Sequence, residues 1–142
     1  MNLTINKILS KEVKWDDFIS EMRWLSFDPS FVKEMVSYLT EDQCIQIAKK
    51  TKDGVIANIR FIYGHSTIEN TVDFIETWCK SANMSYRLTK NDQYKFIITH
   101  DIGKNWSILA SEVTKEFIKE LGFFFTNSIV EPKNYSFVIS EK

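Results

Sequence analysis

The chain has 142 residues, of which 44% are hydrophobic and 14% aromatic, a length and composition that suffice for one domain with a packed core. Its 18 basic and 19 acidic residues leave a net charge of −1, so no overall field attracts the chain to nucleic acid or to an anionic membrane. No apolar run approaches the roughly 20 residues of a membrane span, and the N-terminus lacks the pattern of a secretion signal. We therefore expect a cytoplasmic protein.

The two cysteines predict neither a disulfide nor a metal site. Cys44 and Cys79 each fall on the apolar stripe of a predicted helix. They lack the paired or CxxC spacing that disulfide frameworks and zinc sites show. We expect two buried free thiols, and neither a metal ion nor a cofactor.

The first part of the chain predicts three helices. Residues 2–24 carry apolar side chains at helical spacing, which indicates one long helix. Asp28 is placed to cap a second helix, with Pro29 at its first position. Residues 40–43 have the form of a capping box, which predicts the start of a third helix.

Residues 55–63 are compatible with two structures. Their β-branched side chains favour a strand, whereas the spacing of Val55, Ile59 and Ile62 forms a helical stripe. We favour the helix. Gly64 is expected to end this element, and Ser66 to cap the next helix. The buried face of that next helix is predicted to contain Ile68, Val72, Ile75, Trp78 and Cys79.

The periodicity changes to two at residue 84. Residues 84–98 alternate apolar and polar side chains around a short turn, which predicts a hairpin with one buried face. A helix is expected over residues 104–121, with Gly122 suited to a left-handed C-terminal cap, and residues 123–139 predict a second hairpin. The predicted buried side chains of this helix are Trp106, Leu109, Ala110, Val113, Phe117 and Leu121.

This order of elements predicts an α+β fold. N-terminal helices are followed by a helix–hairpin–helix–hairpin unit (αββαββ), whose four-stranded antiparallel sheet is covered by two helices on one side. We expect residues 1–53 to form a helical segment and residues 54–142 the α+β module, within one cooperative domain. If residues 55–63 were a strand, the alternative would be a ferredoxin-like βαββαβ fold from residue 55.

Two stretches resemble a known group of proteins. Residues 99–107, Thr-His-Asp-Ile-Gly-Lys-Asn-Trp-Ser, are similar to a His-Asp-x-Gly-x-x-Trp-Ser signature that joins a strand to a helix in small, mostly uncharacterised archaeal proteins. Residues 2–9 and 15–18 resemble the last helix of a ribbon-helix-helix DNA-binding unit and the segment that leaves it. The resemblance implies a DNA-binding transcriptional regulator with a C-terminal module.

The ribbon-helix-helix resemblance covers only part of such a unit. In these proteins a paired N-terminal strand enters the major groove and reads base edges. Met1 leaves no room for that strand or for the first helix. We therefore expect DNA binding only if a strand and a helix are encoded upstream of Met1.

Polar side chains gather where the first hairpin meets the following helix. His100 continues the inward face of its strand, and Asp101 is placed to accept the free amides of the helix. This arrangement predicts a structural junction. The functional alternative is a ligand site, because a helix N-terminus offers unpaired N–H donors to an anion. The residues of that site would be His100, Asp101, Lys104, Asn105 and Ser107.

The same junction predicts neither catalysis nor a metal site. A His-Asp pair adjacent in sequence usually directs its side chains apart on a strand, and no serine or cysteine nucleophile with a partnering base is evident. The spacing supplies no third metal ligand. We therefore predict a protein that is not an enzyme.

The N-terminal half contains more aromatic side chains than a short helical segment needs for its own burial, among them Trp24, Phe27 and Phe31. Exposed aromatic side chains mark partner surfaces, so we predict a homodimer formed through the N-terminal helices. The dimer surface would include Ile5, Ile8, Leu9, Trp15 and Phe18. The leading hypothesis is a non-enzymatic regulatory or interaction module, and the alternative is a small-anion-binding domain with a pocket at His100.

Overall fold

The computed structural model of the chain describes residues 27–142. The helix expected over residues 2–24 lies outside the described residues. The helices are α2 (Pro29–Ser37), α3 (Glu41–Tyr63), α4 (Ile68–Ser81) and α5 (Lys104–Glu120). The strands are β1 (Ser85–Lys90), β2 (Tyr94–Thr99), β3 (Phe124–Val130) and β4 (Asn134–Ser140). Within the described range, no helix is both long and apolar enough to cross a membrane.

Local capping signals begin the first two described helices, as predicted. The Asp28 carboxylate accepts a hydrogen bond from the Ser30 amide at 2.8 Å, and Pro29 occupies the first turn of α2. At the start of α3, the Gln43 amide donates to Thr40 Oγ1 at 3.2 Å, and the Thr40 amide donates to Gln43 Oε1 at 2.8 Å. The reciprocal pair satisfies two backbone donors that the helix itself cannot use.

Residues 55–63 form the second part of α3, which confirms the helix and excludes the ferredoxin-like alternative. The helix has 23 residues and contains Gly54 in its interior. It is continuous across residues 53 and 54, where we expected the helical segment to meet the α+β module. Gly64 ends it with a positive φ of 79°, a conformation that glycine adopts without steric cost.

The expected cap of α4 is wrong by one residue. Thr67, not Ser66, precedes the first helical residue, and Thr67 Oγ1 accepts a hydrogen bond from the Asn70 amide at 3.1 Å. Both side chains carry the hydroxyl group that a cap requires. Only the residue directly before the first turn, here Thr67, can reach the free amides. The sequence pattern does not fix the first helical residue with that accuracy.

The helix–hairpin unit occurs twice, with the same turn at the end of each helix. The Met84 amide donates to the Cys79 carbonyl at 2.9 Å, and the Phe123 amide donates to the Ile118 carbonyl at 3.1 Å. The residue before each of these amides is left-handed: Asn83 has φ 53° and Gly122 has φ 91°. Such six-residue hydrogen bonds close a Schellman-type cap.

The two hairpins join into one antiparallel sheet with strand order β1-β2-β4-β3. The second strand of each hairpin is therefore central. Phe96 of β2 lies opposite Phe137 of β4, and their ring centroids are 5.3 Å apart. The inward residues follow the same order in both central strands: Tyr94, Phe96 and Ile98 in β2, then Tyr135, Phe137 and Ile139 in β4.

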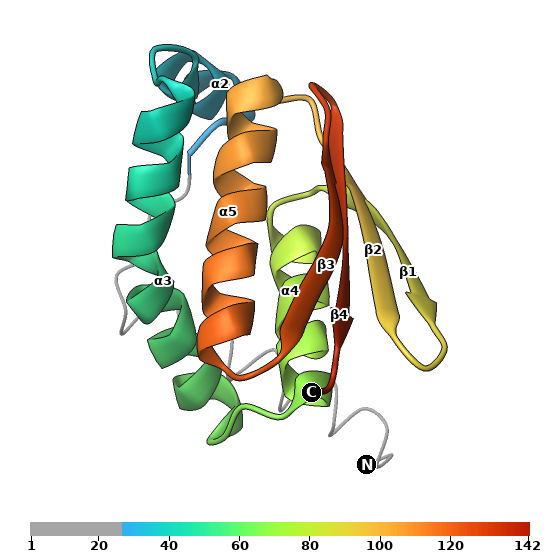
Figure 1. The fold of residues 1–142 in the computed structure, drawn as a ribbon. Helices are drawn as coiled ribbons and strands as arrows, with labels where there is room; N and C mark the ends of the chain where they lie inside the picture. The colour runs from blue at the N-terminus through green and yellow to red at the C-terminus, as the bar shows by residue number, and fades with distance from the viewer. Residues whose placement is uncertain (1–26) are drawn as a thin grey trace, which may run out of the picture.

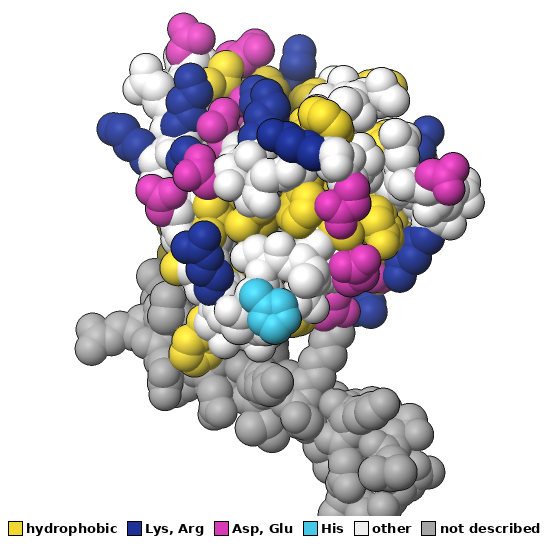
Figure 2. Space-filling view, turned by 60° about the horizontal axis from the view of Figure 1, so that its bottom comes forward, with side chains coloured by type: hydrophobic (Ala, Val, Ile, Leu, Met, Phe, Trp, Pro, Cys, Tyr) yellow, Lys and Arg dark blue, Asp and Glu magenta, His cyan; other side chains and the backbone are white. Residues whose placement is uncertain are grey.

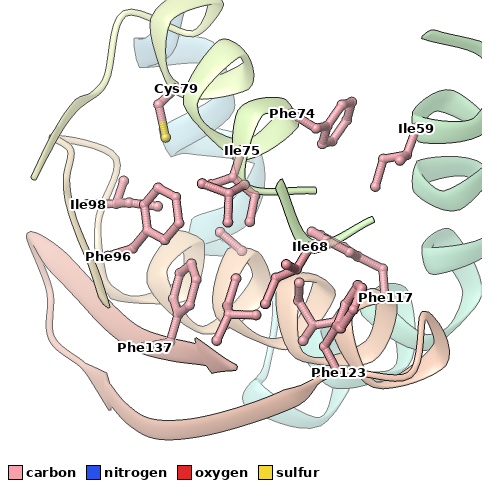
Figure 3. Packing of buried hydrophobic residues seen from close by; sticks show 14 of the residues in the cluster. Ile59, Ile68, Phe74, Ile75, Cys79, Phe96, Ile98, Phe117, Phe123 and Phe137 are labelled. Carbon is pink, nitrogen blue, oxygen red and sulfur yellow. The ribbon is translucent and has the colours of Figure 1, made fainter. Parts of the chain in front are cut away.

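The elements form three layers, which are visible in Figure 1. Helices α4 and α5 cover one face of the sheet, and α3 packs against α5 on the side away from the sheet. The core fills the space between the sheet and the helices, with Phe96 and Phe137 facing Ile75 of α4 (Figure 3). The α+β fold with a four-stranded antiparallel sheet is thus confirmed.

Candidate functional site

His100 lies at the end of β2, and both nitrogens of its ring are engaged in hydrogen bonds. The ring is buried, with 8% of the residue exposed. Nδ1 accepts a hydrogen bond from the Ile102 amide at 3.1 Å, and Nε2 lies 2.6 Å from Ser107 Oγ. Because an accepting Nδ1 carries no proton, Nε2 carries it and donates to the Ser107 hydroxyl. Burial lowers the pKa of His100 and outweighs the opposing effect of the Asp101 carboxylate, which favours this neutral form.

Ser107 continues the contact from the imidazole to the sheet. The serine is fully buried, and its Oγ lies 3.5 Å from the Asn134 carbonyl at the start of β4. The His100 amide donates to the Lys133 carbonyl at 2.9 Å. These contacts hold together the end of β2, the first turn of α5 and the start of β4.

Asp101 does not cap α5, which corrects our expectation. The capping position belongs to Gly103, which has φ 108° and provides no side-chain hydrogen bond to the helix. Asp101 lies two residues earlier, is exposed, and so stands outside the position from which a side chain reaches the first free amides. The Ile102 amide between them already donates to His100.

Asn105 fastens α2 to α5. Its Nδ2 donates to the carbonyls of Val36 and Leu39, each at 2.8 Å. Val36 lies in the last turn of α2, and Leu39 lies just beyond the end of that helix. The Cys44 thiol, in the first turn of α3, donates to the Asn105 carbonyl at 3.7 Å. The sequence placed Asn105 at the start of α5 but contained no signal for this long-range contact.

The five residues predicted to form a ligand site therefore have different surroundings. His100 and Ser107 bond to each other, Asn105 holds α2, and Asp101 and Lys104 are exposed. Neither of the two cavities described below is lined by any of them. Anion binding at this junction stays a prediction. The expected dimer residues Ile5, Ile8, Leu9, Trp15 and Phe18 lie outside the described residues.

An apolar pocket, which sequence periodicity did not predict, lies between α3, α4 and α5. Its volume is about 260 Å³. The lining residues are Ile47, Thr51, Val55 and Asn58 from α3, Phe74, Ile75 and Trp78 from α4, and Trp106, Leu109, Ala110, Val113, Thr114 and Phe117 from α5. Asn58 and Thr114 are buried polar residues of this lining, and Thr114 Oγ1 donates to the Ala110 carbonyl at 2.8 Å. The Nε1 atom of Trp106 is itself buried and has no hydrogen-bond partner in the described part of the chain.

A second cavity opens on the sheet face opposite the helices, and its lining is mixed, with Ile129 and Val138 among polar side chains. It includes Asp92, Gln93 and Lys95 around the β1–β2 turn, with Asn127 and Ser136 from the other hairpin. Residues 27–142 contain no group of three or more histidine, cysteine, aspartate or glutamate side chains able to hold a metal ion.

Comparison with known proteins does not assign the chain to a family. No family model, curated protein or solved structure matches the chain significantly.

The exposed side of α2 carries a stripe of large apolar side chains. Phe27, Phe31, Met35 and Tyr38, which we call the α2 stripe, are 52%, 50%, 46% and 77% exposed. Phe31 and Met35 are four residues apart and share one face of the helix, whereas Phe27 precedes the N-cap Asp28 and Tyr38 is the C-cap. Phe27 and Phe31 stack with ring centroids 5.4 Å apart, and the opposite side of α2 buries only Val36.

Charges of both signs are mixed on the face of the molecule that Figure 2 shows. Lysine and arginine side chains lie beside aspartate and glutamate, with hydrophobic side chains exposed between them. This face therefore has no extended patch of one sign to attract a polyanion.

Proposed function

We propose that the chain is a non-enzymatic regulatory or interaction module that acts by self-association through the α2 stripe. The single observation that carries the proposal is the exposure of four large apolar side chains on and directly beside one short helix. Contiguous exposed apolar surface of this kind marks a partner surface on proteins.

A second copy of the chain is the partner that we propose. An apolar stripe is complementary to itself, so two copies related by a twofold axis can bury it in one isologous contact. The net charge of −1 creates little repulsion between copies. Asn105 supports the stripe from behind, because its two hydrogen bonds hold the end of α2 on the rest of the domain.

The ribbon-helix-helix resemblance would place this self-association in a transcriptional regulator, since such regulators bind DNA as dimers. In that proposal the described domain supplies the dimer contact, and base reading belongs to parts outside residues 27–142. A mobility-shift assay on random duplex at low salt tests it. A shift that weakens with added salt supports DNA binding, and the absence of a shift removes it for this chain.

Sedimentation equilibrium of the full chain tests the self-association. We expect a mass that rises from monomer to dimer with protein concentration, and a Phe31→Ser variant that stays monomeric. Phe124→Ser is the matched control, because Phe124 on the edge strand β3 is 49% exposed, close to the 50% of Phe31. A monomeric wild type, or equal loss of dimer in both variants, would overturn the proposal.

A further inference from the structure

The sheet has two edge strands, β1 and β3, and only β1 has a regular edge. The pairing of β3 shifts register between Thr126 and Ile129, and Asn127 there is left-handed with φ 51°. Such a bulge interrupts the row of backbone groups that another strand would need. In contrast, β1 pairs with β2 without a break from Ser85 to Lys90 and contains neither proline nor glycine. The edge that can accept a further strand is therefore β1.

The outward-facing backbone groups of β1 belong to Tyr86, Leu88 and Lys90. The His100 amide donates to the Lys133 carbonyl at 2.9 Å, in the register that pairs β2 with β4. Because the bonding direction alternates along a strand, even-numbered residues of β2 bond to β4 and odd-numbered ones bond to β1. The β1 residues that bond to β2 are therefore odd-numbered as well. Figure 1 shows β1 at the border of the sheet, with no other described element on its outer side.

On the helix side of the sheet, the β1 edge is apolar and already holds one carboxylate. Tyr86 and Leu88 are half-buried and pack against the core. The Tyr86 hydroxyl donates to Glu76 Oε2 of α4 at 2.7 Å, and Lys90 Nζ lies 3.9 Å from Glu76 Oε1. A second carboxylate on this side would be repelled by Glu76. A strand added to β1 should therefore direct apolar side chains toward the helices.

On the opposite face, the same edge is basic. Arg87 of β1 and Lys95 of β2 are exposed and lie diagonally across the strand pair, since Thr89 is opposite Lys95. Neither strand contains an acidic residue, and neither cation forms an ion pair within the described residues. Opposite charges on neighbouring strands attract and like charges repel. This edge therefore favours an acidic strand and disfavours pairing with β1 of a second copy.

We propose that β1 binds an extended segment of a partner protein, in which acidic and apolar residues alternate, as a fifth, antiparallel strand. Its backbone bonds to Tyr86, Leu88 and Lys90, and its apolar side chains extend the core on the helix side. Its acidic side chains meet Arg87, with Lys95 adding to the positive potential. In such strand addition the main chain supplies affinity and alternate side chains supply specificity. The surface is distinct from the α2 stripe and does not depend on self-association.

Titration of the ¹⁵N-labelled full-length protein with the peptide acetyl-Thr-Val-Glu-Val-Glu-Val-Thr-amide, followed by NMR, tests the proposal. We expect solvent exchange of the Tyr86, Leu88 and Lys90 amides to slow on binding. Exchange of the Arg87 amide, which already bonds to β2, should not change. The peptide with glutamine in place of glutamate should bind about two- to fivefold more weakly, the range that exposed ion pairs support.

Methylation of the peptide nitrogens separates strand addition from other modes of binding. Residues opposite each other in an antiparallel pair have side chains on the same face, so the valines supply the amides that bond to β1. Methylation of the valine nitrogens should therefore abolish binding. Methylation of the glutamate nitrogens is the matched control and should preserve it.

A charge reversal assigns the specificity to the edge. Arg87→Glu should reverse the preference, so that the glutamine peptide binds more tightly than the glutamate peptide. Arg60→Glu is the matched control and should keep the wild-type preference, because Arg60 is exposed on α3, away from the sheet. The backbone spectrum of each variant verifies its fold.

Three results with the wild-type protein would overturn the proposal. The first is no binding of the glutamate peptide, or binding that leaves exchange of the three edge amides unchanged. The second is equal affinity for the glutamate and glutamine peptides. The third is protection of the three edge amides in dilute protein alone, because the edge would then already be occupied.

Discussion

The imidazole Nε2 of His100 donates a buried hydrogen bond of 2.6 Å to the hydroxyl of Ser107, seven residues later and one turn into α5. The bond explains the spacing of histidine and serine in residues 99–107. After His100 the chain leaves β2 and enters α5, and the first turn of this helix brings Ser107 back beside the imidazole. The pair thereby connects both hairpins to α5.

His100→Ala is predicted to destabilise the domain by about 1–3 kcal/mol, because it leaves the buried Ser107 hydroxyl without its donor. Urea denaturation followed by circular dichroism measures the change. His65→Ala is the matched control, since His65 is exposed and its carbonyl, not its ring, is the hydrogen-bond acceptor for Asn70. Equal stability of the two variants would contradict the structural role of His100.

The stability of the domain should depend on pH through His100. Its pKa in the folded state lies below the ordinary value of 6.5, so the unfolded chain takes up the proton first as the pH falls. The unfolded state then binds more protons, and the free energy of unfolding rises with pH in the interval below 6.5. In His100→Gln the free energy of unfolding should lose the part of its pH dependence that His100 contributes. Urea titrations between pH 5 and 7 measure this change. A pH slope unchanged by the substitution would contradict the account.

Asn105→Ala is predicted to loosen α2 without unfolding the remainder. The change removes both hydrogen bonds to the Val36 and Leu39 carbonyls, each worth about 1 kcal/mol. Hydrogen exchange should accelerate in α2 and remain slow in β2 and β4. Asn91→Ala, in the exposed β1–β2 turn, is the control and should leave α2 protection unchanged. Unaltered hydrogen exchange of α2 in Asn105→Ala would contradict the claim that Asn105 holds α2 on the domain.

The equivalent ends of α4 and α5 should differ in how strongly a substitution at the left-handed residue changes stability. Gly122→Ala should cost about 1–2 kcal/mol, because φ is 91° there and an added Cβ would meet no atom within 4 Å, so the cost is conformational alone. Asn83→Gly, at the equivalent position with φ 53°, should be neutral within about 0.5 kcal/mol, since asparagine tolerates this region. Thermal unfolding of both variants compares them. A tolerated Gly122→Ala would argue against the left-handed cap.

Features set by neighbouring residues were predictable, because their physical causes are local. The capping box at Thr40, the period-two hairpins and the left-handed cap at Gly122 each depend on side chains within a few positions. Ser66 and Asp101 were wrong as caps because each carries a suitable oxygen but precedes the capping position. A sequence pattern shows which residues can cap a helix more readily than it shows at which residue the helix begins.

Features set by contacts between distant elements were not predictable. Periodicity marked Trp106, Leu109 and Val113 as buried, yet in the structure they are half-buried and line the pocket, while Ser107 and Ser111 are more deeply buried. The reason is that α5 is covered by the sheet on one side and by α3 on the other. Asn58, a polar residue within an apolar stripe, was the available sequence signal for the pocket.

Self-association through the α2 stripe is tested most directly at Met35. A soluble paramagnetic agent broadens the methyl resonance of an exposed methionine, and Met35 is 46% exposed whereas Met84 is 7% exposed and serves as the internal reference. We predict that the broadening of Met35 declines as the protein concentration rises, while Met84 remains sharp throughout. Broadening of Met35 that is independent of concentration, in a solution where the chain dimerises, would show that the partner surface lies elsewhere.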